Sequence, residues 1–177
     1  MVVLYSPTWE GDRPTATYGS VASHGEKLVN ALLASGRHRV IYRPHPRSGV
    51  VDAEFGAANE RIIAAIGAAN EADPSAHHIF DQSPSIGWQL ALSDVAICDI
   101  SAMIYDRLAT GRPLMVTRPA NPEAEVDEQG YLSECEWLTA DDANDAVAVL
   151  DRVHGDPDAR EHVAKWSTRY FGDTTPG

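Results

Sequence analysis

The sequence predicts an α/β fold in which a parallel β-sheet carries helices on both faces. Short β-branched or apolar runs alternate with segments that repeat apolar residues at helical spacing through most of the chain. This alternation is typical of parallel sheets joined by right-handed crossovers. At 177 residues the chain is long enough for one core and short for two ordinary domains. We therefore expect residues 1–177 to form a single Rossmann-like domain.

The expected strands end at residues that cannot continue a sheet. Val2-Val3-Leu4-Tyr5 stops at Ser6-Pro7, and the run from Arg39 to Tyr42 stops at Arg43-Pro44-His45-Pro46, because proline lacks the N–H of a ladder bond. Further strands are expected at 77–80, at 94–98, which has the composition of a fully buried strand, and at 114–117, with 136–138 as a last edge strand.

The expected helices occupy the segments between these strands. Leu28, Val29 and Leu32 recur at helical spacing and predict the first helix, which Gly36 ends. Ser83-Pro84 predicts the start of another, because serine is a good cap and proline is favoured at the first helical position. The other helices are expected at 52–69, at 101–110, from Asp141 or Asp142, and from Asp156-Pro157, while 121–132 is loop or a short helix and 172–177 shows no periodicity.

The composition argues against several classes of protein. The formal net charge of −12 disfavours nucleic-acid binding, because affinity for a polyanion depends on Lys and Arg. No apolar run approaches the roughly 20 residues that span a bilayer, and the N-terminus lacks the layout of a signal peptide, so we expect a cytoplasmic location. Cys98 and Cys135 have no partner at zinc-ligand spacing, and no Gly-rich dinucleotide or P-loop motif is present. We expect neither a metal nor a cofactor.

Polar clusters follow three of the expected strands. They are Ser6-Pro7-Thr8-Trp9, Arg43-Pro44-His45-Pro46 and Asp99-Ile100-Ser101. Because ligands of open parallel sheets bind beyond the carboxyl ends of the strands, we expect these clusters to converge on one site. The backbone N–H groups of Ala102, Met103 and Ile104, with Asp99 and the Ser101 hydroxyl beside them, would suit a phosphate at a helix start. Ser101 could instead serve only as a helix cap.

His45 is the candidate catalytic residue of this site. Two prolines fix its backbone at the strand end, where the imidazole can donate to a phosphate oxygen or to a leaving group. Arg43 would add positive charge beside a diphosphate, or would pair with a surface carboxylate, and Thr8 would add a hydroxyl. Glu134 could meet a ribose hydroxyl if the loop after Gly130 folds over the crevice.

These segments resemble, in order and spacing, the motifs of the CDP-glycerol glycerophosphotransferase family, the teichoic-acid primases and polymerases. The resemblance covers about residues 2–132. It rests on Leu4–Trp9, Arg43–Pro46, Ser93–Ser101, and Asp106 with Gly111-Arg112-Pro113. The departures from the family pattern are Ile100 and Ala102 in its Asp-Tyr-Ser-Ser turn, Glu10 at a position that is usually basic, and Gln129 in place of an arginine.

The resemblance implies that the chain is the C-terminal, donor-binding half of a GT-B glycosyltransferase fold, within a larger two-domain transferase of cell-envelope polymer synthesis. The implied donor is CDP-glycerol or a similar nucleotide-activated alcohol or sugar, with His45 at its diphosphate and Ser101 as the first serine of the turn. The acceptor and any general base would come from an N-terminal domain outside these residues, so we expect this chain alone to be inactive. The family acts at the inner face of the membrane, so membrane contact is expected only through the full-length protein.

Three other functions remain open from the sequence. A GT-B glycosyltransferase with a UDP- or GDP-sugar donor is the nearest alternative. A nucleotide-sugar epimerase shares this fold, but it needs its own acid and base near the sugar, and the sequence does not supply candidates for both roles. A binding module that has lost its chemistry is compatible with Ala102 in the turn.

Overall fold

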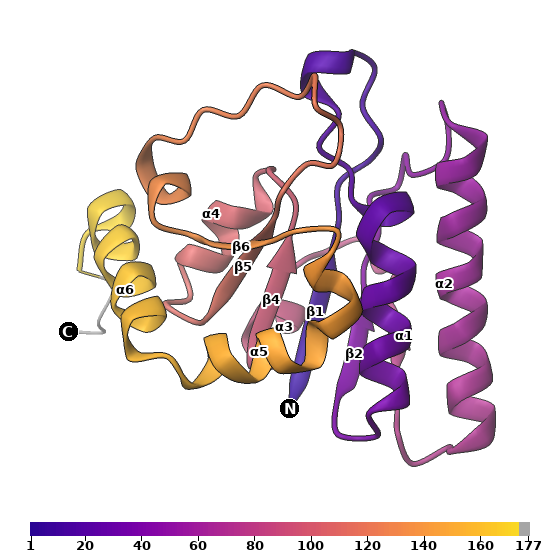
Figure 1. The fold of residues 1–177 in the computed structure, drawn as a ribbon. Helices are drawn as coiled ribbons and strands as arrows, with labels where there is room; N and C mark the ends of the chain where they lie inside the picture. Colours follow the sequence, from indigo (N-terminus) through magenta and orange to yellow (C-terminus); the bar gives the residue numbers. More distant parts are fainter. Residues whose placement is uncertain (174–177) are drawn as a thin grey trace.

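A computed structural model describes residues 1–173 and contains one sheet of six parallel strands (Figure 1). The strand order is β3-β2-β1-β4-β5-β6, so successive strands are added on one side of β1 up to β3 and on its other side from β4 onward. The predicted α/β fold is confirmed. The strands are β1 (Val2–Ser6), β2 (Arg39–Tyr42), β3 (Ile79–Phe80), β4 (Val95–Cys98), β5 (Leu114–Thr117) and β6 (Glu136–Leu138).

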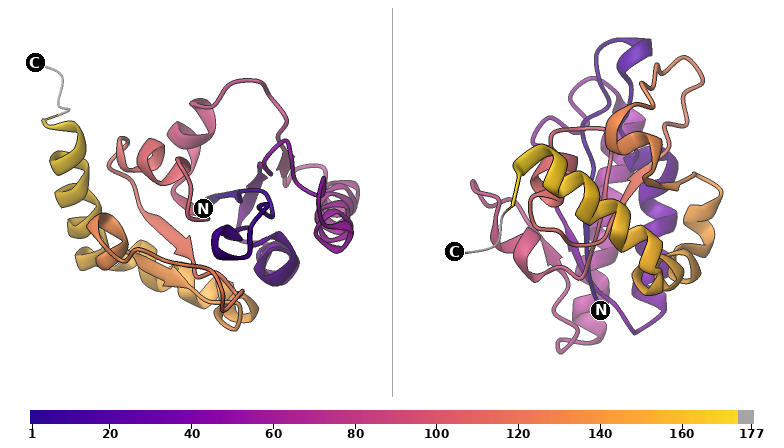
Figure 2. Two further views of the ribbon diagram at one scale, coloured as in Figure 1. Left: turned by 90° about the horizontal axis from the view of Figure 1, so that it is seen from above. Right: turned by 90° about the vertical axis from the view of Figure 1, so that its left-hand side faces the viewer.

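Helices cover both faces of this sheet, because successive side chains of each strand point to opposite sides. Val3 and Tyr5 of β1 pack in one apolar cluster with α1, α2 and α5, whereas Leu4 packs in a second cluster with α3, α4 and α6. Figure 2 shows the two layers from above. The helices are α1 (Glu26–Ala34), α2 (Ala53–Ala72), α3 (Trp88–Leu92), α4 (Met103–Leu108), α5 (Ala146–Gly155) and α6 (Pro157–Phe171).

Two long helices begin where the sequence places their caps. The Asp52 side chain accepts hydrogen bonds from the N–H groups of Glu54 and Phe55 at the start of α2. The Asp156 side chain accepts from the N–H of Asp158 at the start of α6. In both cases an acceptor satisfies N–H groups that have no partner inside the helix.

The predicted start of α3 at Ser83-Pro84 is wrong, because the helix begins only at Trp88. The Ser83 N–H donates to the Asp81 carboxylate at 3.0 Å, which holds this residue in a turn. Gly87 then takes a φ of 153°, a conformation that favours glycine, directly before the helix. The local cap signal is therefore used by a loop and not by the helix.

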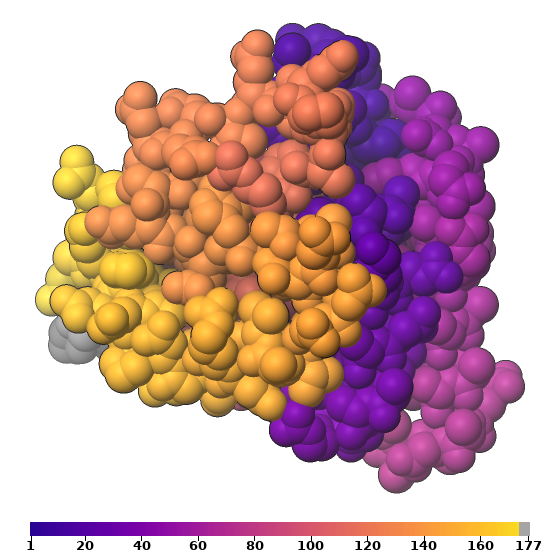
Figure 3. Space-filling view, viewed as in Figure 1, coloured from indigo at the N-terminus to yellow at the C-terminus, as the bar shows by residue number. Residues whose placement is uncertain are grey.

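The chain after β5 returns over the sheet edge before the last helices. Residues 121–132 form a loop that ends in a 3₁₀ turn at Gly130–Ser133, and β6 is the edge strand that the sequence predicts. This segment, with α5 and α6, forms much of one face beside α1 and α2 (Figure 3). Within residues 1–173 no helix is long and apolar enough to cross a membrane. Residues 174–177, part of the aperiodic end of the sequence, lie outside the described residues.

Arg107 of α4 is the largest fully buried side chain in the described part of the chain, and it donates hydrogen bonds to the oxygen atoms that surround it. Its guanidinium donates to the carbonyls of Leu90, Ser93, Asp94 and Pro113 and to the Ser93 hydroxyl, at 2.7–3.1 Å. The bonds join the end of α3, the start of β4 and the approach to β5. Burial lowers the pKa of Arg107 to about 10, so the group is still charged at neutral pH.

We expect Arg107→Met to lower the free energy of unfolding by roughly 3 kcal/mol, because it leaves several buried carbonyls without a donor. Urea denaturation followed by circular dichroism measures the change. Arg112→Met is the matched control, since Arg112 is exposed and gives one bond to the Ser93 carbonyl at 3.2 Å. Equal losses in the two variants would contradict this account of Arg107.

Candidate functional site

The three predicted polar clusters come together at the carboxyl edge of the sheet. There they surround a crevice with a volume of about 340 Å³. The crevice lies where the strand order reverses between β1 and β4, which is the usual ligand position in such sheets. Its lining residues are Ser6, Pro7 and Thr8 after β1, Arg43 to Pro46 after β2, Ile86 before α3, and Ser101, Ala102 and Met103 at α4.

A second hollow, of about 580 Å³, lies at the opposite edge of the sheet. Arg37, His38 and Arg39 line it, but so do residues at the C-terminal ends of α1 and α2. Helix C-termini carry partial negative charge, so basic side chains there compensate the helix dipoles and the surroundings disfavour a phosphate. The crevice at the carboxyl edge is therefore the candidate site.

Asp99 does not line the crevice, contrary to the prediction that it binds a diphosphate. The residue is fully buried beneath it. One carboxylate oxygen accepts from the N–H groups of Thr8 and Ser20 at 2.7 and 3.0 Å, and the other accepts from the Thr117 hydroxyl. Burial raises the pKa of Asp99 to about 6, and hydrogen bonds from Ser20, Thr117 and Thr8 oppose this rise only in part. Asp99 thus fixes the loop that carries Thr8, and both of its carboxylate oxygens accept hydrogen bonds from the protein.

His45 lines the crevice with one ring nitrogen already engaged. Its Nδ1 lies 3.1 Å from the backbone N–H of Arg47, which donates to it. This bond assigns the proton of the neutral ring to Nε2. Burial lowers the pKa of His45, the nearby Arg47 charge lowers it further, and the Glu10 carboxylate raises it. At neutral pH the ring is therefore an uncharged Nε2–H donor.

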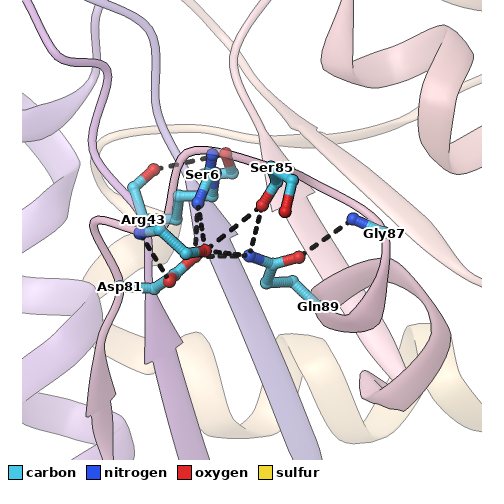
Figure 4. Close-up of polar contacts among 7 residues, drawn as sticks. Ser6, Arg43, Asp81, Ser85, Gly87 and Gln89 are labelled. Atoms are coloured by element: carbon cyan, nitrogen blue, oxygen red, sulfur yellow. Dashed lines mark hydrogen bonds and ion pairs between the residues drawn. The ribbon is translucent and has the colours of Figure 1, made fainter.

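Arg43 is held against the crevice wall by a buried network (Figure 4). Its guanidinium donates to the Asp81 carboxylate at 2.5 Å, and Gln89 of α3 donates to the same oxygen at 2.6 Å. Burial raises the pKa of Asp81, but hydrogen bonds from Ser83, Gln89 and Arg43 outweigh burial and lower it. Arg43 does pair with a carboxylate, but with the buried Asp81 and not with a surface carboxylate as the alternative predicted. The pair lies beside the crevice.

The start of α4 presents fewer unpaired N–H groups than the sequence predicts. The Met103 N–H donates to the Ser101 hydroxyl at 3.3 Å, and the Ile104 N–H donates to the Ser101 carbonyl. Ser101 thus acts as a cap and lines the crevice as well. While it accepts the bond from Met103, the Ser101 hydroxyl can still donate a hydrogen bond to a ligand. Thr8, which also has a hydroxyl, lines the same crevice.

The structure does not bring Glu134 to the crevice, so its predicted contact with a ribose is not supported by its position. Its carboxylate accepts from the Lys165 ammonium at 2.7 Å and from the Trp166 indole N–H at 2.8 Å. Both partners belong to α6, on the far side of the loop. An acidic residue after a Gly-containing loop is a weak signal, because its partner is chosen by which helix packs nearby.

Asp81 and Gln89 belong to the network that holds Arg43, and the sequence predicted this role for neither. Asp81 follows β3 directly, and β3 pairs with β2, which carries Arg43. An acidic residue at a strand end next to a basic one is therefore the signal that points to the pair. Gln89 gives no such signal, because it joins Asp81 only through the late start of α3.

Comparison with known proteins gives matches among solved structures. A trehalose-6-phosphate structure from E. coli bound with UDP-2-fluoro glucose has a TM-score of 0.61 at 13% identity, covering 97% of this chain and 41% of that one. A UDP-forming α,α-trehalose-phosphate synthase from Burkholderia vietnamiensis has a TM-score of 0.60 at 12% identity, covering 97% and 40%. The chain has the fold of one half of a GT-B glycosyltransferase.

A third match, the corresponding Burkholderia xenovorans synthase, has a TM-score of 0.55 at 12% identity and covers 94% of this chain and 43% of that one. The chain thus spans about two fifths of the length of these solved structures. No protein-family model matches the sequence, and a comparison with curated proteins gave no match. At such low identity the likeness shows the GT-B half-domain fold, which agrees with the fold class that the sequence predicts.

The raised pKa of Asp99 predicts a pH-dependent loss of stability. Between 3.8 and about 6 the folded state holds the Asp99 proton more tightly than the unfolded chain. Stability from this group is therefore present below pH 3.8 and is lost as the pH rises toward 6. We expect the wild type to lose stability relative to Asp99→Asn across this window, measured by urea denaturation at successive pH values.

Asparagine can keep the hydrogen bonds of Asp99, with its amide oxygen toward Thr8 and Ser20 and its amide nitrogen toward Thr117. Asp142→Asn is the control, because bonds from Thr139 lower the pKa of this exposed carboxyl and reverse the sign. A stability difference between wild type and Asp99→Asn that stays constant from pH 4 to 6 would contradict the prediction.

Proposed function

We propose that this chain is the C-terminal, donor-binding half of a two-domain GT-B glycosyltransferase that uses a nucleoside-diphosphate sugar. The observation that carries the proposal is the crevice at the carboxyl edge, where His45, Arg43, Ser101 and Thr8 meet in this fold. Each of these side chains can donate a hydrogen bond, so their set matches the oxygen atoms of a diphosphate.

The donors would act when the bond between sugar and phosphate breaks. Negative charge then develops on the departing nucleoside diphosphate, and prearranged donors stabilise it more than they stabilise the intact donor. His45 would give its Nε2–H, because Nδ1 is occupied by the Arg47 N–H. Arg43 would supply the positive charge, since Asp81 fixes its position through a single guanidinium nitrogen. The acceptor and any base would come from the other domain, so we expect no turnover by this chain alone.

Two considerations bear on the donor. The solved structures of similar fold include one bound with UDP-2-fluoro glucose and one described as UDP-forming, which supports a UDP-sugar first. CDP-glycerol is the second candidate, and the ordered segments Leu4–Trp9, Arg43–Pro46 and Ser93–Ser101 favour it. Because the two donors share a diphosphate, the residues that line the crevice have the same role with either.

Isothermal titration of the chain with UDP, CDP and GDP tests the proposal. We expect one of them to bind, and His45→Ala and Ser101→Ala each to weaken it about tenfold or more, since a hydrogen bond to a charged group is worth roughly 1.5–3 kcal/mol. The preferred base also separates the UDP-sugar and CDP-glycerol readings.

His77→Asn is the control for His45→Ala, because His77 is exposed on the approach to β3 at the opposite edge, and asparagine tolerates its φ of 52°. This variant should bind like the wild type. If none of the three nucleotides binds to the folded chain at millimolar concentration, the donor site is not in this crevice.

A further inference from the structure

Glu10 is a buried acidic residue whose carboxylate holds a segment distant in the sequence. It lies in the loop that follows β1 (the β1 loop) and is only 7% exposed. One oxygen accepts from the Gly49 N–H at 2.9 Å, and the other accepts from the N–H groups of Val51 and Asp52 at 2.7 and 3.1 Å. Burial raises the pKa of Glu10, but these bonds outweigh burial and lower it, so the group is ionised at neutral pH.

The segment that Glu10 holds is the one that follows His45. Turns join the His45 carbonyl to the Ser48 N–H and the Arg47 carbonyl to the Val50 N–H. Gly49 has a φ of 82° and lies so close to Gly56 of α2 that an added Cβ would be 2.5 Å from its Cα. The segment is therefore fixed by α2 on one side and by the Glu10 carboxylate on the other.

The β1 loop contacts the segment after His45 at a second point, where Trp9 meets Arg47. The Arg47 guanidinium carbon lies 3.8 Å from the centroid of the Trp9 ring, next to Glu10. The Arg47 backbone N–H is the donor to His45 Nδ1. Trp9 and Glu10 of the β1 loop thus hold the two sides of the turn that orients the imidazole.

We propose that Glu10 is a positioning residue for His45, which holds the 45–51 turn so that the Arg47 N–H reaches Nδ1 and Nε2–H is left for a ligand. The proposal rests on the proposed function only for the identity of that ligand.

Helix capping alone does not account for Glu10. Asp52 already caps α2 through the N–H groups of Glu54 and Phe55. The partners of Glu10 come before the helix, in the turn itself. A buried carboxylate is costly unless it is fully hydrogen-bonded, and here the bonds that compensate its burial all go to the segment after His45.

The test is an NMR titration of the His45 imidazole in the wild type, Glu10→Ala, Glu10→Gln and Asp52→Ala, without ligand. If Glu10 positions the turn, its loss frees the ring to water and breaks the Arg47 bond, so the pKa of His45 rises toward its ordinary value of 6.5. If Glu10 acts only by its charge, Glu10→Ala lowers this pKa, because a neighbouring carboxylate is removed. The two accounts therefore differ in sign.

Glu10→Gln retains an oxygen for the Val51 and Asp52 N–H groups, so it should keep the turn and leave the His45 pKa at or below the wild-type value. Asp52→Ala is the matched control for stability, because it removes a cap at the same helix start and leaves the backbone partners of Glu10 in place. It should lower stability and leave the His45 titration unchanged. A His45 pKa that falls or stays constant in Glu10→Ala overturns the proposal, as does a rise in Asp52→Ala equal to that in Glu10→Ala.

Titration with UDP completes the test. We expect Glu10→Ala to raise the Kd about tenfold, the loss of roughly 1.4 kcal/mol of binding free energy, and Asp52→Ala to leave it unchanged. Absence of UDP binding to the wild type would count against the proposed UDP donor, whereas the imidazole titration would still decide the role of Glu10. Equal UDP affinity of Glu10→Ala and wild type would overturn the positioning role.

Discussion

The buried carboxylate of Asp99 is the interaction on which the geometry of the crevice depends. It lies directly after β4, one of the two strands between which the strand order reverses. Its hydrogen bonds join the end of β4 to Thr8 in the β1 loop, to Ser20, and to Thr117 of β5. A neutral residue without acceptors would leave two buried N–H groups unpaired. Burial raises the pKa of Asp99, so its ionised form at neutral pH is expected to cost some of the stability of the fold, and the hydrogen bonds to these strand ends offset part of that cost.

Asp99 is one of three buried acidic residues that hold the lining of the crevice in place. Asp81 holds Arg43, and Glu10 holds the turn after His45. Each carboxylate faces inward, toward N–H groups, and the donors Arg43, His45, Ser101 and Thr8 face the crevice. In this way a chain with a formal net charge of −12 presents hydrogen-bond donors to a ligand, because the acids nearest to the crevice accept their hydrogen bonds from groups of the protein.

The sequence predicted the elements of this fold well, for a physical reason. Buried parallel strands must be short apolar runs, so β1, β2, β4 and β5 could be recognised within a residue or so. The ends of β1 and β2 are marked as well by prolines, which lack a ladder donor. The start of α3 was predicted wrongly because the cap signal at Ser83 competes with another local bond, from the Ser83 N–H to the Asp81 carboxylate two residues earlier. Glu134 was assigned to a ribose from its place after a loop, but its partners are Lys165 and Trp166.

The sequence by itself determined the α/β fold and the three segments that meet at the carboxyl edge, because strand ends in a parallel sheet share one edge. Only the tertiary structure decided what each side chain does there. It turned Asp99 inward, paired Arg43 with Asp81, and set Nδ1 of His45 against the Arg47 N–H. These outcomes depend on which neighbour is within hydrogen-bond distance and on how deeply a charge is buried, and spacing along the chain encodes neither.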